Sequence, residues 1–375
     1  MKKLLLLALA IVLVISAFAL VGCGKDDATT DDATTVTTEE AKAKIGISMP
    51  TQSLQRWNQD GANMKNAFEA EGYTVDLQFA GDNDIPTQIS NIENMIAGGC
   101  DVLVIAAIDD GALTEVLKGA ADANIPVIAY DRLIRNSDAV KYYATFDNKK
   151  VGTLQGEFIA EALDLENQKG PFNIELFTGD PADNNVNFFF PGAMEVLQPY
   201  IDKGVLVVPS GQTAQDQAAT PDWNTEKAQA RMENLIAAQG YGPDGKALDA
   251  VLSSNDSVAN GITNALVGAG FTKDNFPVLT GQDADKISVQ NMLNGLQSMS
   301  VFKDTRVLAE RVVKMVNAIV AGQPVETNSD DIYERVEGSG DFVPTFQEDP
   351  IVVTLDNYQK ILLDSGYYQP SDIGL

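Results

Sequence analysis

Short apolar runs alternate with amphipathic segments along most of the sequence, and this alternation constrains the fold more than any other feature. Runs such as 102–106 and 127–130 have the length and composition of strands that are buried on both faces. The segments between such runs carry apolar residues at helical spacing, for example Ile89, Ile92 and Ile96. Because strands that alternate with helices form right-handed βαβ units, the sequence predicts an α/β fold with parallel sheets.

The alternation ends once and begins again, which indicates two lobes of similar construction. The first series closes with the strand 142–146 and the residues Asp147 and Asn148, and the second series opens with a helix through Val151 and Leu154. About 330 residues follow the N-terminal region, which is enough for two α/β domains with cores of their own. We therefore expect two Rossmann-like lobes, each built around a parallel sheet.

The N-terminal residues have the features of a lipoprotein export signal. In residues 1–22, two lysines precede an apolar core at 4–19, which is too short and too close to Cys23 to favour a membrane-spanning helix. The tetrapeptide LVGC that ends at Cys23 matches a lipobox, in which the cysteine becomes lipid-modified. The alternative is an ordinary secretory signal with a chance cysteine. Residues 23–43 are rich in Asp, Thr, Glu and Ala, so we expect a disordered tether.

The composition limits the partners of the chain. With Cys23 assigned to lipid modification, Cys100 is the only other cysteine, so no internal disulfide is expected. The net charge of −27 argues against nucleic acid or an anionic membrane surface as a partner, because both would repel the protein. We therefore expect contact with a membrane only through the lipid anchor.

Residues for several kinds of catalysis are missing from the sequence. It contains no histidine, the commonest general base and the usual zinc ligand. The G-x-S-x-G, P-loop and HExxH motifs are also absent, and the G-x-G at 268–270 follows a predicted helix instead of a strand. The segment 180–185 resembles a cation loop in composition but lacks the EF-hand spacing. No catalytic residue, cofactor or metal site is therefore predicted, although paired carboxylates leave a carbohydrate hydrolase as an alternative.

Polar side chains follow predicted strands of both lobes, at the point where each strand ends. Asp109 follows the strand 102–106, and Asp131 and Arg132 follow the strand 127–130. In the second lobe the same position is taken by Asn184-Asn185, Asn255-Asp256 and Gln282-Asp283. Each residue alone is of a type common in helix caps and turns. Ligands of open α/β sheets, however, bind beyond the carboxyl ends of the strands, so the recurrence in both lobes predicts a ligand site.

The residue types at these positions suit a ligand rich in hydroxyl groups. Asp, Asn and Arg offer planar donors and acceptors that can hold vicinal hydroxyls without reacting with them. For Asp131 and Arg132, a surface ion pair is the alternative. Trp57 and Trp223, the two tryptophans of the sequence, could cover the apolar faces of a sugar ring or could be core residues.

Several long motifs make the sequence distinctive. They are QRWNQDG from Gln55, QISNIENMIAGGCDVLVIAAID from Gln88, AYDRLIRNSDAVKYYATFDN from Ala129, GPFNIELFTGDPADNN from Gly170, SSND from Ser253, GQDAD from Gly281 and VFKDTR from Val301. In these motifs the sequence resembles the type I periplasmic sugar-binding proteins of ABC importers, and among them most closely the xylose-binding and multiple-monosaccharide-binding branch. The resemblance covers almost the whole chain after the tether.

The resemblance implies a set of sugar-contacting residues and a division of the chain. The contacts it implies are Arg56, Trp57, Asp109, Asp131, Arg132, Asn185, Trp223, Asn255, Asp283 and Lys303. It also implies a three-crossover hinge, which we expect near 147–148, 282–283 and 322–324. The N-terminal lobe would then comprise 44–147 plus 284–322, and the C-terminal lobe 148–283 plus 323–375. Asp131 and Arg132 would act as a coupled pair on adjacent ring hydroxyls.

The function implied by the resemblance is that of a lipid-anchored extracytoplasmic solute-binding protein. As a monomer, it would close its lobes over an aldopyranose such as xylose, glucose, galactose or arabinose and deliver it to the transmembrane subunits of an ABC permease. A sensory protein that binds the same sugar and docks on a receptor or kinase is an alternative. A sugar-responsive repressor of the same fold is disfavoured by the export signal and by the lack of a basic helix-turn-helix segment.

Overall fold

The structure is a computed structural model of the protein, and it describes residues 42–375. The predicted signal at 1–22, the predicted lipidation site Cys23 and nearly all of the predicted tether lie outside these residues. Of the helices in the described part of the chain, none is long and apolar enough to cross a membrane.

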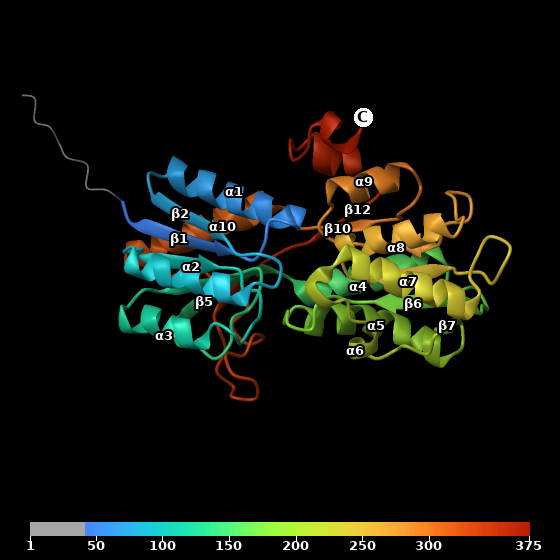
Figure 1. The fold of residues 1–375 in the computed structure, drawn as a ribbon, viewed down its shortest axis with the longest axis horizontal. Coiled ribbons are helices and arrows are strands. Elements are labelled where there is room, and N and C mark those ends of the chain that lie inside the picture. Colours follow the sequence, from blue (N-terminus) through green and yellow to red (C-terminus); the bar gives the residue numbers. More distant parts are fainter. Residues whose placement is uncertain (1–41) are drawn as a thin grey trace, which may run out of the picture. The chain divides into compact units, whose positions relative to one another are not determined.

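The first sheet is entirely parallel, with the strand order β11-β5-β4-β3-β1-β2. Its strands are β1 (Lys44–Met49), β2 (Thr74–Phe79), β3 (Val102–Ile105), β4 (Val127–Tyr130), β5 (Val140–Phe146) and β11 (Thr345–Glu348). The helices that cover it are α1 (Gln55–Ala70), α2 (Ile85–Ala97), α3 (Thr114–Asp122) and α10 (Thr305–Val320). Figure 1 shows α1 and α10 on one face and α2 and α3 on the other. We call this sheet and its helices the first lobe.

The second sheet has the order β7-β6-β8-β9 and is also parallel. Its strands are β6 (Phe172–Phe177), β7 (Leu206–Val207), β8 (Ala250–Ser253) and β9 (Val278–Leu279). An antiparallel pair, β10 (Ser300–Phe302) and β12 (Ile351–Val353), is joined to the segment after β9 by a bridge between Gln282 and Val301. The helices of this second lobe are α4 (Asn148–Ala162), α5 (Val186–Asp202), α6 (Gln215–Ala218), α7 (Thr225–Gln239), α8 (Asp256–Gly268) and α9 (Lys286–Leu293), with short helical turns at Pro221–Trp223, Gln359–Leu363 and Pro370–Ile373.

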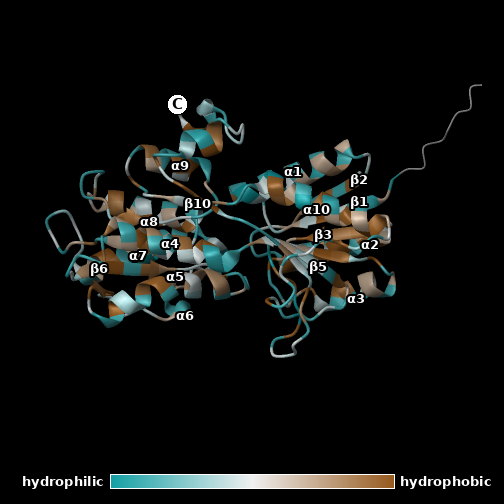
Figure 2. Cartoon of the chain, turned by 180° about the vertical axis from the view of Figure 1, so that it is seen from behind, coloured by the Kyte–Doolittle hydropathy of each residue, from teal (hydrophilic) through white to brown (hydrophobic). Residues whose placement is uncertain are grey.

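Both sheets are buried on two faces, as the apolar strands predicted. Val104 packs against the core under α1 and α10, whereas its neighbours Leu103 and Ile105 pack under α2 and α3. On β1, Gly46 lies so close to the second of these cores that a Cβ there would be 2.7 Å from Leu103 Cδ2. In Figure 2 the strands are mostly brown, while the helices carry both brown and teal residues. The predicted α/β fold with two parallel sheets is therefore confirmed.

Several helices begin at polar residues that follow strands. The side chains of Asp84, Asp147 and Asn255 each accept a hydrogen bond from the backbone N–H three residues later, which starts α2, α4 and α8. Such caps satisfy backbone donors that have no partner within the helix. The carboxyl ends of the strands and the starts of the following helices thus meet at one edge of each sheet.

Within residues 42–375 the chain crosses between the two lobes three times, at Asp147, at 303–304 and at 349–350. The first crossing lies where the sequence predicted it. The second and third were expected near 282–283 and 322–324, and these two predictions are wrong. The chain stays in the second lobe through β10, and it stays in the first lobe through β11.

Two parts of the predicted lobe division are wrong for the same reason. Helix α9 lies in the range 284–322, predicted to belong to the first lobe, but it packs against α8 and the turn Pro370–Ile373 of the second lobe. Strand β11 lies in the range 323–375, predicted to belong to the second lobe, but it pairs with β5 in the first sheet. The hydropathy pattern marks a strand, but the sheet that the strand joins depends on hydrogen bonds to residues far away in the sequence.

Candidate ligand-binding site

A cavity lies where the strand ends of the two lobes meet. Of the ten predicted contacts, nine line it: Arg56, Trp57, Asp131, Arg132, Asn185, Trp223, Asn255, Asp283 and Lys303. Arg56 and Trp57 come from the first turn of α1, and the others follow strands or precede helices. Five of the nine, Asp131, Arg132, Asn185, Asn255 and Asp283, had been named by the rule that ligands bind beyond strand carboxyl ends, whereas the other four had been implied only by the family resemblance.

The tenth predicted contact, Asp109, is not brought to the cavity. Its Oδ1 atom accepts hydrogen bonds from the backbone N–H groups of Gly111 at 2.9 Å and Ala112 at 2.8 Å. The Asp109 side chain thus stabilises the turn after β3, as aspartate side chains commonly do in turns.

Other lining residues were not among the ten predicted contacts. They are Leu54, Asp183, Phe189, Ser257, Gln282 and Asp285. The strand-end rule had already named Gln282 beside Asp283, and it could have found Asp183, which lies two residues before Asn185. No local signal marks Phe189 or Leu54, whose side chains reach the cavity only because α5 and α1 are placed beside it.

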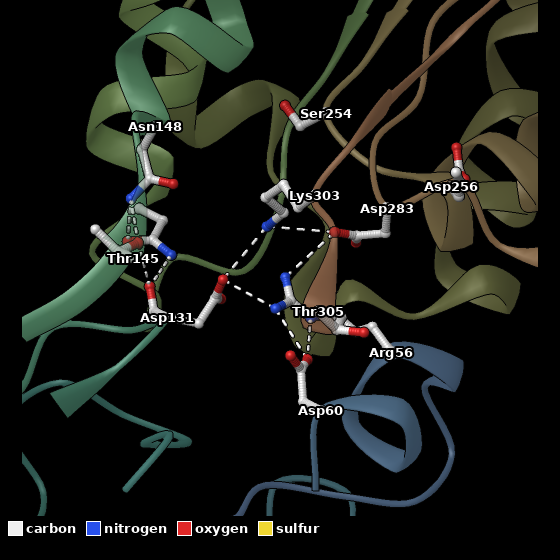
Figure 3. Close-up of polar contacts among 12 residues, drawn as sticks. Arg56, Asp60, Asp131, Thr145, Asn148, Ser254, Asp256, Asp283, Lys303 and Thr305 are labelled. Atoms are coloured by element: carbon white, nitrogen blue, oxygen red, sulfur yellow. Dashed lines mark hydrogen bonds and ion pairs between the residues drawn. The ribbon is translucent and has the colours of Figure 1, made fainter. Parts of the chain in front are cut away.

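The polar centre of the cavity is a network of buried charges. Arg56 lies 3.0 Å from Asp60, 2.9 Å from Asp131 and 3.2 Å from Asp283. Lys303 Nζ lies 3.5 Å from Asp131 and 3.3 Å from Asp283. Figure 3 shows Arg56 and Lys303 side by side between the two carboxylates. Asp131 follows a strand of the first sheet and Asp283 follows β9, so the network joins the two lobes.

Arg132 pairs across the lobes and not with its neighbour Asp131. Its Nε atom lies 3.0 Å from Asp183 Oδ2, and one Nη donates to the Ala107 carbonyl at 3.1 Å. The predicted pairing of Asp131 with Arg132 is therefore wrong, because Asp131 pairs with Arg56 and Arg132 pairs with Asp183. The reason is a tight turn: Asp131 has φ 57°, and the Arg132 N–H donates to the Tyr130 carbonyl, which sends the two side chains in different directions.

Several cavity residues have strained backbones. Asp131, Trp223 and Asp283 have φ values of 57°, 53° and 95°, in the left-handed region that residues with a Cβ avoid. Each such residue costs on the order of 1–3 kcal/mol and persists only where its surroundings hold it in place. Of the nine non-glycine residues with positive φ among residues 42–375, these three face the cavity.

The two tryptophans are both core residues and cavity walls. Trp57 is 1 % exposed and lies under the guanidinium groups of Arg56 and Arg132, at 4.4 and 5.0 Å from its ring centroid. Trp223 is 4 % exposed and meets Phe189 edge to face, with 6.3 Å between the centroids. The two interpretations left open by the sequence are therefore compatible, since each ring packs into a lobe and lines the cavity.

The two asparagines of the wall also have structural roles. Asn185 Nδ2 donates to the Asp131 carbonyl at 2.9 Å, and its Oδ1 lies 3.1 Å from the Tyr143 hydroxyl. Asn185 therefore links α5 of the second lobe to the turn that carries Asp131. Asn255 caps α8 by accepting from the Val258 N–H at 2.9 Å.

Burial and neighbouring charges set different protonation states in the network. Burial alone would raise the pKa of Asp131, but Arg56, Lys303 and Arg132 outweigh burial and hold that pKa below its ordinary value. Burial raises the pKa of Asp60 to about 6, although Arg56 opposes the rise. Burial and the charge of Asp283 raise the pKa of Asp285 to about 7. Asp131 is thus an anion at neutral pH, whereas Asp60 and Asp285 gain protons under mildly acidic conditions.

Five buried polar atoms on cavity residues have no hydrogen-bond partner among residues 42–375, and one of them, Arg132 Nε, lies 3.0 Å from Asp183 Oδ2 in an ion pair. The other four are the indole Nε1 atoms of Trp57 and Trp223, Gln282 Oε1 and Asp285 Oδ1. A buried polar group without a partner costs about 1–3 kcal/mol, so each such group calls for a physical explanation. Two of these four atoms are donors and two are acceptors, which matches a ligand whose groups can both donate and accept, such as hydroxyls.

The described residues hold no group of three or more His, Cys, Asp or Glu side chains arranged to bind a metal ion. In the acidic segment around Asp180 and Asp183, both carboxylates interact with protein groups. Asp180 accepts from the Ala182 N–H at 3.1 Å, and Asp183 pairs with Arg132.

Comparison with known proteins gives a consistent result. The chain matches the periplasmic binding protein domain over residues 45–324. It is 49 % identical to the multiple sugar-binding periplasmic protein SbpA of Azospirillum brasilense, over 89 % of this chain and 92 % of that protein. It is 34 % identical to the D-xylose-binding periplasmic protein of Escherichia coli, over 91 % of this chain and 95 % of that protein. An ABC transporter solute-binding protein from Clostridium phytofermentans, solved with bound β-D-glucose, is 54 % identical, with a TM-score of 0.84 over 88 % of this chain and 99 % of that one.

Proposed function

Because the chain belongs to the periplasmic binding protein family, we propose that it captures a monosaccharide in the cavity between its lobes and delivers it to an ABC permease. The ligand is an aldopyranose of the class that includes glucose, xylose, galactose and arabinose. The observation that carries this proposal is the network of Arg56, Lys303, Asp131 and Asp283, flanked by the two indole rings. The protein acts as a monomer and does not alter the sugar, in keeping with a family of binding proteins.

The chemistry of the cavity supports a neutral polyol as the ligand. Asp131 and Asp283 accept from ring hydroxyls, while Arg56 and Lys303 donate to hydroxyl and ring oxygens. The unpartnered Trp57 Nε1 and Gln282 Oε1 atoms add one donor and one acceptor. Charge-assisted hydrogen bonds contribute about 1.5–3 kcal/mol each, so a few of them offset the cost of ordering the sugar and closing the lobes.

Lobe closure is the step that couples binding to transport in this proposal. The cavity wall is drawn from both lobes, so a sugar that contacts Asp131 and Asp283 together stabilises the closed arrangement. A closed protein presents both lobes to the permease in one fixed geometry. Lobe closure in response to sugar can be measured as a decrease in the radius of gyration by small-angle X-ray scattering.

We also propose that Cys23 carries the lipid anchor that holds the protein at the outer face of the cell membrane. The LVGC tetrapeptide that ends at Cys23 supports this assignment. Expression in a bacterial host with labelled palmitate should give a labelled protein that partitions into detergent. A Cys23→Ser variant should be unlabelled and released from the membrane, and labelling of that variant would contradict the assignment.

Calorimetric titration with a panel of pentoses and hexoses tests the binding function. At least one should bind with Kd in the micromolar range or below, about −8 kcal/mol. After long incubation, chromatography should recover the same sugar unchanged. Failure of every aldose in the panel to bind, or conversion of the bound sugar to a product, would show that the proposal is wrong.

A further inference from the structure

One of the contacts between the lobes outside the cavity wall is made by aromatic side chains. Phe188, on the first turn of α5 in the second lobe, packs against Tyr333, which lies between α10 and β11 in the first lobe. Their ring centroids are 5.0 Å apart, with the planes inclined at 53°. Tyr333 in turn meets Tyr143 of β5 edge to face, with centroids 4.9 Å apart. We call Phe188, Tyr333 and Tyr143 the aromatic clasp.

The clasp places a side chain of one lobe against the core of the other. Tyr333 and Tyr143 are 1 % and 0 % exposed, and both belong to the first-lobe core under α2 and α3. Phe188 is half-buried and packs on that core, although the rest of α5 packs within the second lobe. The contact therefore depends on the lobes being together, because neither lobe contains all of its parts.

The Tyr333 side of the clasp is held firmly by the first lobe. The Tyr333 hydroxyl accepts a hydrogen bond from Gln347 Nε2 at 2.7 Å. Two residues later, the guanidinium of Arg335 donates to the Ser137 carbonyl at 2.9 Å, and the Arg335 carbonyl accepts from the Asn136 N–H at 2.8 Å. Separation of the lobes would consequently withdraw Phe188 from a prebuilt apolar surface.

The clasp is linked to the cavity through two short connections. Phe188 lies three residues after Asn185, and its N–H donates to the Asn185 carbonyl at 2.9 Å. The Tyr143 hydroxyl lies 2.6 Å from the Asp131 carbonyl and 3.1 Å from Asn185 Oδ1. Asn185 and Asp131 both line the cavity, whereas neither Phe188 nor Tyr333 is among the described residues that do so.

We propose that Phe188 and Tyr333 are positioning residues that form a clasp on closure and slow the release of the sugar without touching it. This inference rests on the proposed sugar-binding function. A contact present only in the closed state stabilises that state and leaves the first encounter with the sugar unchanged. The stabilisation that an aromatic pair of this kind gives to the closed state is large enough to lower the dissociation rate constant of the sugar several-fold.

The test compares Phe188→Ala with a matched control, Phe158→Ala. Phe158, on α4, is also half-buried, but it packs against the second lobe's own core. Release of radiolabelled D-glucose or D-xylose, whichever binds in the sugar panel, is followed after a chase with unlabelled sugar. Phe188→Ala should raise the dissociation rate constant about three- to tenfold and leave the association rate constant within about twofold of wild type.

Further variants and controls separate a clasp from a general loss of structure. Phe158→Ala should leave both rate constants close to wild type, and Phe188→Tyr, which keeps the ring, should restore slow release. Thermal unfolding of each sugar-free variant reports any damage to the fold itself. The clasp proposal would be wrong if Phe188→Ala released sugar with the wild-type dissociation rate constant. It would also be wrong if Phe158→Ala released sugar as fast as Phe188→Ala. If the wild-type protein binds no sugar, the proposed function itself fails, and the clasp fails with it.

Discussion

Replacement of Asp131 tests the charge network at the centre of the cavity. Asp131 is 2 % exposed, and its carboxylate contacts Arg56 at 2.9 Å and Lys303 at 3.5 Å. The change Asp131→Asn keeps the size of the side chain but removes its charge. It leaves both cations buried beside a neutral amide, which cannot offset their charge.

The size of the effect follows from the partners that remain. Removing one member of a buried, hydrogen-bonded charge pair costs about 2–5 kcal/mol. Arg56 keeps Asp60 and Asp283, and Lys303 keeps Asp283, so we expect the lower part of this range for sugar binding. A loss of about 2–3 kcal/mol corresponds to a Kd about 30- to 150-fold higher.

Calorimetry with the best sugar of the panel measures this change, and Asp109→Asn is the matched control. Asp109 also follows a first-lobe strand, but it caps a turn and does not reach the cavity. We expect Asp109→Asn to bind within about twofold of wild type. A Kd for Asp131→Asn within about threefold of wild type, or an equal loss in Asp109→Asn, would refute the assignment of the network to ligand binding.

The remaining predictions concern the walls and the buried carboxylates. Sugar should change the tryptophan emission in a saturable way, and Trp57→Phe or Trp223→Phe should each remove part of the change; an unaltered emission in the wild-type protein would contradict both as walls. Gly179→Ala would put a Cβ 2.0 Å from the Trp223 ring. We therefore expect this variant to be less stable than wild type by about 1–3 kcal/mol in thermal unfolding and to bind sugar more weakly. Wild-type stability together with wild-type sugar affinity would show that the Trp223 ring can move aside. The pKa of Asp60 is raised from 3.8 to about 6, so the native state binds its proton more tightly than the unfolded state. The resulting stabilisation is fully present below about pH 4 and is lost as the pH rises through about 6. Between about pH 4 and pH 6 the Asp60→Asn variant should therefore lose less stability than the wild-type protein. If stability changes with pH in the same way in both proteins, the raised pKa of Asp60 is wrong.

The class of fold and the cavity residues at the strand ends could be predicted from local features of the sequence, whereas Arg56, Trp57, Trp223 and Lys303 were implied only by the family resemblance. The strand 127–130 was predicted with its observed bounds, since a short apolar run needs burial on both faces. The same run places Asp131 directly after a strand of a parallel sheet. All strands of such a sheet end at one edge, so polar residues such as Asn185 and Asn255, far apart in sequence, were expected to converge.

Tertiary structure alone decided which groups meet. Asp131 and Arg132 are adjacent in sequence, yet they pair with Arg56 and with Asp183, because a backbone turn at Asp131 separates their side chains. Strand β11 joined the first sheet although its place in the chain suggested the second lobe. Phe188 contacts Tyr333 across the lobes, and nothing in the local pattern of either residue indicates the other. A hydropathy pattern records whether a residue is buried, but its partner depends on the path of the whole chain, which a local pattern does not contain.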